Sequence, residues 1–430
     1  MILLGWLALL ILYSVNQLHL PSDLGLPGLN ALNLIFMFGV VLVVLLARGP
    51  RLPKPNLSGP LKFYFAMMSI ATLIAIWVRP MGLMADLTYL KTLVFYPLYY
   101  FLFYYAARDL TRTRLWIAAV LFVAVVAGLE AWSEAISYGI GSYVESHRAA
   151  GPFGPDFYSA NRAGVFYAMF LPMLLAPVLF LKTRPLFRVI ALGSVLILLG
   201  AILFTYSRQA YAIGLLGMAL LAFKRGIGTA TLGLVVFLIA LPWLPQGATE
   251  RVEETKQTGE YGQAQYDEST ESRWILWEGG LAMWMENPFG IGANRFKTEI
   301  GNYSRYSGKD AHNYYVLTLA ETGWQGLLSL LWLVWAMWRL GGRLSRAAFD
   351  PESRALAYGF RVAVLAMILG NIYGSPFSEG AIMGVFWALA GLMERYMSLR
   401  WQAAQALNAM PTRHASARAG AASASPRGLP

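Results

Sequence analysis

The sequence predicts an all-α polytopic membrane protein with about twelve transmembrane helices and one large extramembrane loop between the ninth and the tenth. Hydrophobic residues make up 57% of the 430 positions, charged residues only 13%, and the mean hydropathy is +0.51. Soluble domains carry about 25% charged residues. Apolar runs of about 17–25 residues, long enough to cross a bilayer as helices, recur along almost the whole chain. These observations place the chain in the membrane class.

The composition also excludes several classes of site and partner. The chain contains no cysteine, which rules out disulfides, thiolate metal sites and a cysteine nucleophile. A net charge of +11 is typical of nucleic-acid binding, but the basic residues lie at the ends of apolar runs, where they orient membrane helices. We therefore expect no nucleic-acid partner.

The apolar runs define the predicted spans. The first run lacks a basic flank and a small-residue cleavage site, so we interpret it as a span rather than a removable signal. Nine spans are expected in the domain 1–244 and three in the domain 312–398. The runs lie at about 2–20, 31–47, 61–78, 88–106, 115–137, 162–181, 186–204, 207–223, 227–244, 312–338, 355–371 and 378–397.

Basic residues mark one side of the membrane. They cluster in alternate connections and after the last span, at 48–54, 108–114, 182–188, 224–225, 339–354 and 395–427. The intervening short connections contain almost none. By the positive-inside rule, both termini are cytoplasmic and the large loop faces the opposite side. The Ala/Ser/Arg-rich segment 399–430 is predicted to be a disordered cytoplasmic tail.

The large loop covers 245–311 and contains a predicted amphipathic helix at about 270–286. Trp274, Trp277, Leu281 and Trp284 recur there at spacings of three and four, which is typical of one helix face. Amphipathic indole rings favour the membrane interface. Thr270 is the predicted N-cap of this helix. Gly290 and Gly292 allow a tight turn after the helix.

His312 is the first candidate for chemistry. It lies where the large loop meets the tenth predicted span, whereas His19, His147 and His414 lie at a span end, in the shorter outside segment 138–161 and in the tail. An imidazole accepts a proton near neutral pH, as a general base must. The position equally suits a histidine that only begins a helix, so position alone leaves both interpretations open.

Arg208 and Arg273 are the candidates for binding an anion. Arg208 follows Thr205–Ser207 in a short outside turn, and Arg273 lies at the start of the amphipathic helix. A guanidinium is always charged and matches phosphate oxygens with a planar fork, so two of them would suit a diphosphate. The alternatives are an ion pair of Arg273 with Glu271 or Glu278, and an Arg208 side chain that only reaches the interface.

Four further polar residues are supporting candidates: Arg148, Arg295, Asn313 and Glu321. Glu321 lies nine residues beyond His312, about 13 Å along a helix and on its opposite face, so a direct His–Glu pair is not expected. We predict for Glu321 a structural partner in another span, such as Arg361. No phosphate-binding loop and no His-Glu-x-x-His zinc signature occurs, so we expect no nucleotide hydrolysis, metal or cofactor.

Together these segments resemble the bacterial O-antigen ligase family and its relatives, the O-antigen polymerases and protein O-oligosaccharyltransferases. The resemblance covers about 120 residues of the second half. It rests on Thr205-Tyr206-Ser207-Arg208, Arg273-Trp274, Glu286-Asn287-Pro288-Phe289-Gly290-Ile291-Gly292, His312-Asn313-Tyr314-Tyr315-Val316-Leu317 and Glu321-Thr322-Gly323-Trp324-Gln325-Gly326. In the first half only the Gly/Pro-rich segment 151–161 is similar.

The resemblance implies a membrane-embedded glycosyltransferase of the lipid-donor type in the bacterial inner membrane, with its active site and large loop facing the periplasm. The donor would be an O-antigen glycan on undecaprenyl diphosphate, and the acceptor a sugar hydroxyl of lipid A–core. His312 would activate that hydroxyl, and Arg208 and Arg273 would bind the diphosphate. A polymerase or a protein-glycosylating enzyme would share this site, because the difference lies in the acceptor. A lipid or polysaccharide transporter is the alternative outside this chemistry.

Overall fold

The computed structural model is an almost entirely α-helical bundle. It describes residues 1–15, 23–26, 29–47, 49–140, 143–154, 159–182, 184–253, 256–258, 264–266 and 268–409. The strands within these ranges form two short antiparallel ladders, β1 (Asp23–Leu26) with β2 (Leu29–Asn30) and β3 (Lys256–Thr258) with β4 (Ala264–Tyr266). The predicted all-α class is therefore confirmed for the body of the protein.

The described helices fall into long apolar helices and short helices of the large loop. The first group is α1 (Ile2–Ser14), α2 (Ala31–Leu46), α3 (Ser58–Val78), α4 (Leu83–Phe95), α5 (Leu98–Ala106), α6 (Leu110–Tyr138), α7 (Ser159–Phe180), α8 (Pro185–Phe204), α9 (Arg208–Arg225), α10 (Ile227–Ala240), α14 (Tyr314–Ala347), α15 (Pro351–Gly370) and α16 (Gly380–Ala409). The second is α11 (Gln246–Glu253), α12 (Glu268–Glu286) and α13 (Phe296–Glu299). Four 3-10 turns are η1 (Gly151–Phe153), η2 (Leu241–Trp243), η3 (Ile300–Asn302) and η4 (Pro376–Ser378).

Five described helices are long and apolar enough to cross a membrane: α3, α6, α7, α8 and α15. Three shorter apolar segments accompany them, at Ile2–Ser14, Ala31–Leu46 and Ile227–Trp243. Their length and composition identify a membrane protein. The count of twelve spans stays a prediction.

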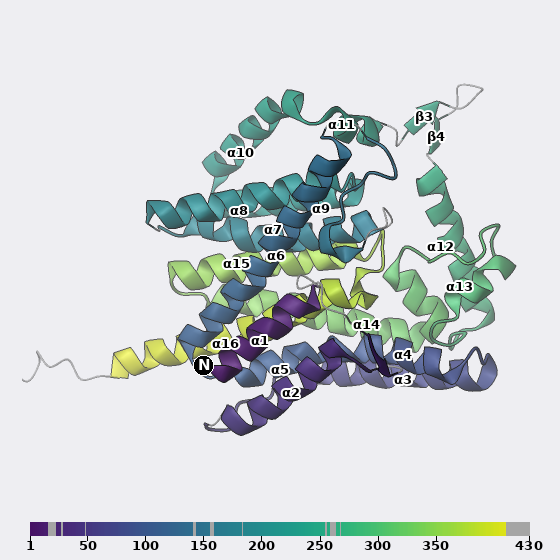
Figure 1. Cartoon of the computed structure of the whole chain (residues 1–430), viewed down its shortest axis with the longest axis horizontal. Coiled ribbons are helices and arrows are strands. Elements are labelled where there is room, and N and C mark those ends of the chain that lie inside the picture. The colour runs from purple at the N-terminus through teal and green to yellow at the C-terminus, as the bar shows by residue number, and fades with distance from the viewer. Residues whose placement is uncertain are drawn as a thin grey trace, which may run out of the picture.

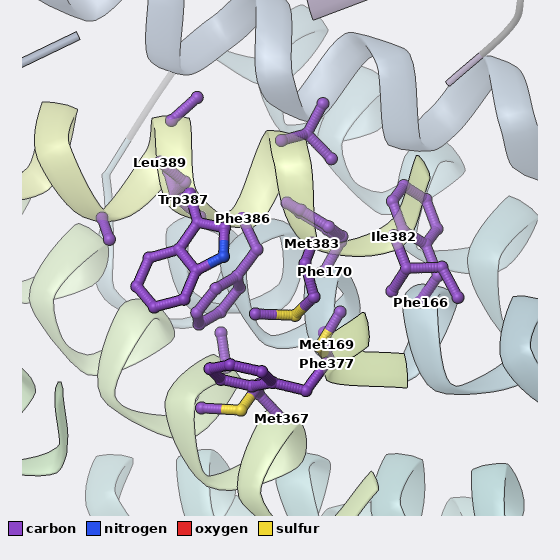
Figure 2. Packing of buried hydrophobic residues seen from close by; sticks show 14 of the residues in the cluster. Phe166, Met169, Phe170, Met367, Phe377, Ile382, Met383, Phe386, Trp387 and Leu389 are labelled. Carbon is purple, nitrogen blue, oxygen red and sulfur yellow. The ribbon is translucent and has the colours of Figure 1, made fainter. Parts of the chain in front are cut away.

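The helices lie roughly side by side, and the large loop gathers at one end of the bundle (Figure 1). The helices α12 and α13 and the β3–β4 ladder lie at this end, whereas the last turns of α16 project from the opposite end. At the centre, α7 packs between α8, α9 and α15, and its residues from Ala163 to Leu174 are all buried. Figure 2 shows aromatic and methionine side chains of α7, α15 and α16 interlocking around Phe377.

Three predicted boundaries differ from the structure. The predicted span 88–106 is broken into α4 and α5 next to Pro97, since a proline has no backbone N–H for a helix interior. The helix predicted at about 270–286 is present as α12, but it begins at Glu268, so Thr270 lies inside it and is not its N-cap. Residues 399–409, predicted as tail, continue α16, and 410–430 lie outside the described residues.

The helix α14 contains a break at Gly323, whose φ of 72° and ψ of −175° are not helical. The turn 288–292 docks into this break. Ile291 N–H donates to Ala320 O at 3.0 Å and Gly292 N–H to Glu321 O at 2.9 Å. In return, Trp324 N–H donates to Pro288 O at 3.2 Å. The turn thus supplies partners for backbone groups that a break inside a membrane would otherwise leave unsatisfied.

We expect Gly323→Ala to destabilise the protein by at least about 1–3 kcal/mol, the cost of a residue held in a backbone region reserved for glycine. Its Cβ would also lie 2.4 Å from Phe289 C and 2.6 Å from Pro288 O. Gly342→Ala is the matched control, because it lies in the same helix with no atom within 4 Å of an added Cβ. The control should be neutral or stabilising by up to about 1 kcal/mol. Thermal unfolding in detergent, followed by tryptophan fluorescence, measures both variants, and equal midpoints would contradict this account of the break.

Candidate functional site

His312 lies at the extramembrane end of α14 in a backbone conformation unusual for its type. Its φ is +48°, in the left-handed region where non-glycine residues are uncommon. Its neighbours fix it on both sides. The Asn313 side chain caps α14 by accepting from Tyr315 N–H at 3.0 Å and Val316 N–H at 3.1 Å, and Ala311 O accepts from the Trp277 indole at 2.9 Å. His312 is an exposed residue, although the protein around it partly desolvates its imidazole.

The helix α12 brings Arg273 to the same place. It buries Leu276, Gly279, Gly280 and Met283, one stripe at spacings of three and four, and it packs on α14 and η3. The predicted tryptophan face is therefore divided, because Trp277 donates to Ala311 O and packs on Tyr373, whereas Trp274 keeps 48% of its surface exposed. This exposure agrees with indole rings that meet a membrane interface.

The turn 371–375 connects α14, α12 and α9. Tyr314 N–H donates to Asn371 O at 3.0 Å and to Gly374 O at 3.1 Å. The guanidinium of Arg273 lies over the Tyr373 ring at 5.6 Å from its centroid. From the other side, Gln209 Nε2 donates to Leu369 O at 3.1 Å and to Gly370 O at 2.9 Å. Since Arg208 and Gln209 begin α9, the turn brings Arg208, Arg273 and His312 to one end of the bundle.

Arg208 itself is half-buried at the helix start. The preceding Ser207 caps α9 by accepting from Ala210 N–H at 3.4 Å. The N-termini of α9 and α14 thus lie on two sides of the same turn. Helix N-termini carry partial positive charge, which favours an anion nearby. Arg208 adds a full positive charge to this electropositive end.

Charged groups around His312 set its protonation. Desolvation by the surrounding protein is the main cause that lowers the pKa of His312 below its usual value. Asp310 opposes this shift, and the cations of Arg273, Arg162 and Lys297 add to it. A lowered pKa keeps the imidazole neutral near pH 7, the form that can accept a proton.

Glu379 and Arg162 form an ion pair at 3.2 Å beside this group. Desolvation raises the pKa of Glu379, and the Arg162 cation opposes the rise. No sequence pattern predicted a role for Arg162, Lys297, Asp310 or Glu379. Arg162 directly follows the Gly/Pro-rich segment 151–161, which gave a weak signal. Lys297 and Asp310 lie in the large loop and Glu379 at the start of the predicted span 378–397, without a pattern.

Arg148 and Arg295 are buried and serve the scaffold. Arg148 donates from Nε to Thr205 O at 2.9 Å and from Nη2 to Asn161 Oδ1 at 2.6 Å, which fixes the turn before Arg208. Arg295 is fully buried and makes a bidentate ion pair with Asp86 at 2.6 and 2.7 Å. Both side chains are thus held by protein groups.

The prediction that Arg361 is the partner of Glu321 is wrong. The buried Glu321 carboxylate accepts from Tyr89 OH at 3.1 Å and from Phe296 N–H at 3.0 Å. Arg361 lies instead over the Trp338 ring, 4.8 Å from its centroid. Glu321 therefore ties α4 and α13 to α14. Glu271, one of the two partners considered for Arg273, forms an ion pair with Arg305 at 2.8 Å.

Among the described residues, no group of three or more histidine, aspartate or glutamate side chains is arranged to hold a metal ion. The groups that gather at this end of the bundle are the His312 imidazole and the cations of Arg273, Arg162 and Lys297. Such a group suits the transfer of a group from an anionic donor to a hydroxyl.

In a comparison with protein families, residues 193–331 match the family model described as O-antigen ligase. This segment runs from α8 into α14 and includes Arg208, Arg273, His312 and Glu321, and it supports the family resemblance drawn from the motifs. No curated protein matches the chain.

Proposed function

Because residues 193–331 carry the signature of the O-antigen ligase family, a family of glycosyltransferase-like enzymes, we propose that this protein is an O-antigen ligase. It transfers a glycan from undecaprenyl diphosphate to a sugar hydroxyl of lipid A–core. The observation that supports the proposal is that Tyr314, two residues after His312, and Arg273 contact the turn 371–375, while Gln209, next to Arg208, contacts the end of α15 just before this turn. A base and two cations are the groups that this transfer needs.

In the proposed reaction, His312 removes the proton from the acceptor hydroxyl as its oxygen attacks the anomeric carbon of the donor sugar. The bond to the diphosphate breaks, and the undecaprenyl diphosphate leaves with the negative charge. Arg208 and Arg273 bind this charge, which grows as the bond breaks, so they stabilise the transition state more than the bound donor. The diphosphate is already an activated leaving group, so the reaction proceeds without ATP or metal. Because the acceptor oxygen displaces the diphosphate directly, the anomeric configuration is inverted.

We further propose that the chain crosses the bacterial inner membrane twelve times, with both termini cytoplasmic and the site facing the periplasm. The charge distribution supports this orientation, because basic residues cluster in alternate connections. The arrangement of the bundle is in keeping with it, since α12 and α13 lie at the end opposite to the last turns of α16 (Figure 1).

Reconstitution into proteoliposomes tests the proposal. Purified protein is mixed with lipid A–core and an undecaprenyl-diphosphate glycan, without ATP and with a chelator. Glycan attached to lipid A–core, with inverted configuration, is the expected product. A longer glycan on the undecaprenyl carrier would make the protein an O-antigen polymerase, and transfer to an added protein acceptor would make it a protein O-oligosaccharyltransferase. Movement of lipid without a new glycosidic bond would identify a transporter.

A further inference from the structure

We propose that Asp310 is a positioning residue for His312: its carboxylate holds the backbone before α14 in place, ties it to the turn 371–375 and counters the cations around the imidazole. This inference rests on the proposed function, because it assigns a role in the same transfer. Asp310 lies outside the motifs on which the family resemblance was built, and it touches the backbone of His312 rather than a reacting atom.

The geometry shows a carboxylate oxygen shared between two segments. Asp310 Oδ1 accepts from His312 N–H at 3.2 Å and from the Ser375 hydroxyl at 3.4 Å. The first bond closes a tight turn from Asp310 to His312, the residue whose φ is +48°. A non-glycine residue keeps a left-handed backbone conformation where the surrounding structure holds it there. Here the Asp310 carboxylate, two residues earlier, helps to hold the backbone of His312. The second bond joins this turn to the segment that carries Tyr373 beneath Arg273.

The charges give Asp310 a second task. Three cations act on the imidazole, from Arg273 on α12, Arg162 on α7 and Lys297 on α13, and all of them favour its neutral form. Of the two carboxylates in this group, Glu379 is engaged with Arg162 at 3.2 Å. Asp310 is the carboxylate whose charge opposes the cations at His312. Without it, the imidazole would be a weaker base and would take the acceptor's proton less readily.

Asp310→Asn separates the two tasks, because the amide oxygen still accepts hydrogen bonds while the charge is lost. We expect the pH at which His312 is half-protonated to fall in Asp310→Asn, and to rise in Arg273→Gln, where a cation is removed. The rate of carbethoxylation of His312 by diethyl pyrocarbonate, read by peptide mass spectrometry across pH, measures this midpoint in the full-length protein without any substrate. Asp109→Asn, an equal change of charge at an exposed side chain that is not among the groups acting on His312, should leave the midpoint unchanged.

In the transfer assay, Asp310→Asn should lower kcat on the order of tenfold and move the acidic limb of the kcat profile to lower pH, with little change in donor KM. Ser375→Ala, which removes the tie but no charge, should lower kcat without moving that limb. A His312 midpoint in Asp310→Asn equal to that in Asp109→Asn would overturn the inference. A wild-type protein that makes no product would refute the proposed function instead, since the carbethoxylation midpoints require no transfer.

Discussion

Replacing His312 by alanine should lower the kcat of glycan transfer by about 10²–10⁴-fold, the usual contribution of a general base. The acceptor hydroxyl would then have to lose its proton to water while its oxygen attacks. Arg208 and Arg273 remain in this variant, so we expect the KM for the lipid-linked donor to change by less than about threefold. Initial rates of product formation in proteoliposomes, measured with separately varied donor and acceptor, give both constants.

His147→Ala is the matched control. His147 is a second described histidine outside the membrane helices, and its ring stacks on Tyr138 at a centroid distance of 5.1 Å. It is not among the groups that act on His312, so its loss should leave kcat within about twofold. If His312→Ala kept more than a tenth of the wild-type rate, the assignment of His312 as the base would have to be abandoned.

Replacing Asp86 by asparagine should destabilise the folded protein by about 3–5 kcal/mol, because it leaves the guanidinium of Arg295 buried without its counter-charge. The two side chains are 0% and 1% exposed, and Arg295 Nη1 and Nη2 each donate to one carboxylate oxygen. Arg295 Nε also donates to Arg79 O at 2.6 Å, so the guanidinium joins α3, α4 and the segment before α13. Unfolding in detergent against a chemical denaturant measures the loss.

The exposed pair Asp109–Arg112 provides the comparison, with side chains that are 47% and 51% exposed. Asp109→Asn should cost less than about 1 kcal/mol, since water screens such pairs and asparagine caps a helix as well as aspartate does. Replacing both Asp86 and Arg295 with apolar residues of similar size should recover much of the stability lost in Asp86→Asn. An equal loss of unfolding free energy in Asp86→Asn and Asp109→Asn would show that the buried pair stabilises the protein no more than the exposed pair.

The sequence allowed the prediction of those features that depend on local pattern. Apolar runs predicted most of the long helices, and the tryptophan spacing predicted α12 to within two residues of its observed start. The sequence also predicted that Arg273 and His312 would lie near each other, because one helix and a glycine turn connect them.

Features that depend on packing between distant segments could not be predicted in this way. Asp86 and Arg295 are 209 positions apart in the chain, and only the fold makes Arg295 a scaffold residue. Tyr89, the side-chain partner of Glu321, lies 232 positions away from it in the chain. The opposite charge of Arg361 therefore led to the wrong prediction. The tryptophan stripe was predicted correctly as a helix face, but periodicity does not say whether such a face meets protein or lipid.

The turn 288–292 inside the break of α14 has a consequence for how two helices are placed. Backbone hydrogen bonds splice this turn into the same helix whose first residues follow His312, and Phe296 N–H adds a bond to Glu321. The helix that carries Arg273 and the helix that follows His312 are therefore joined by main-chain hydrogen bonds into one block. The two helices cannot shift relative to each other without breaking these bonds, so the turn 288–292 fixes how they are placed.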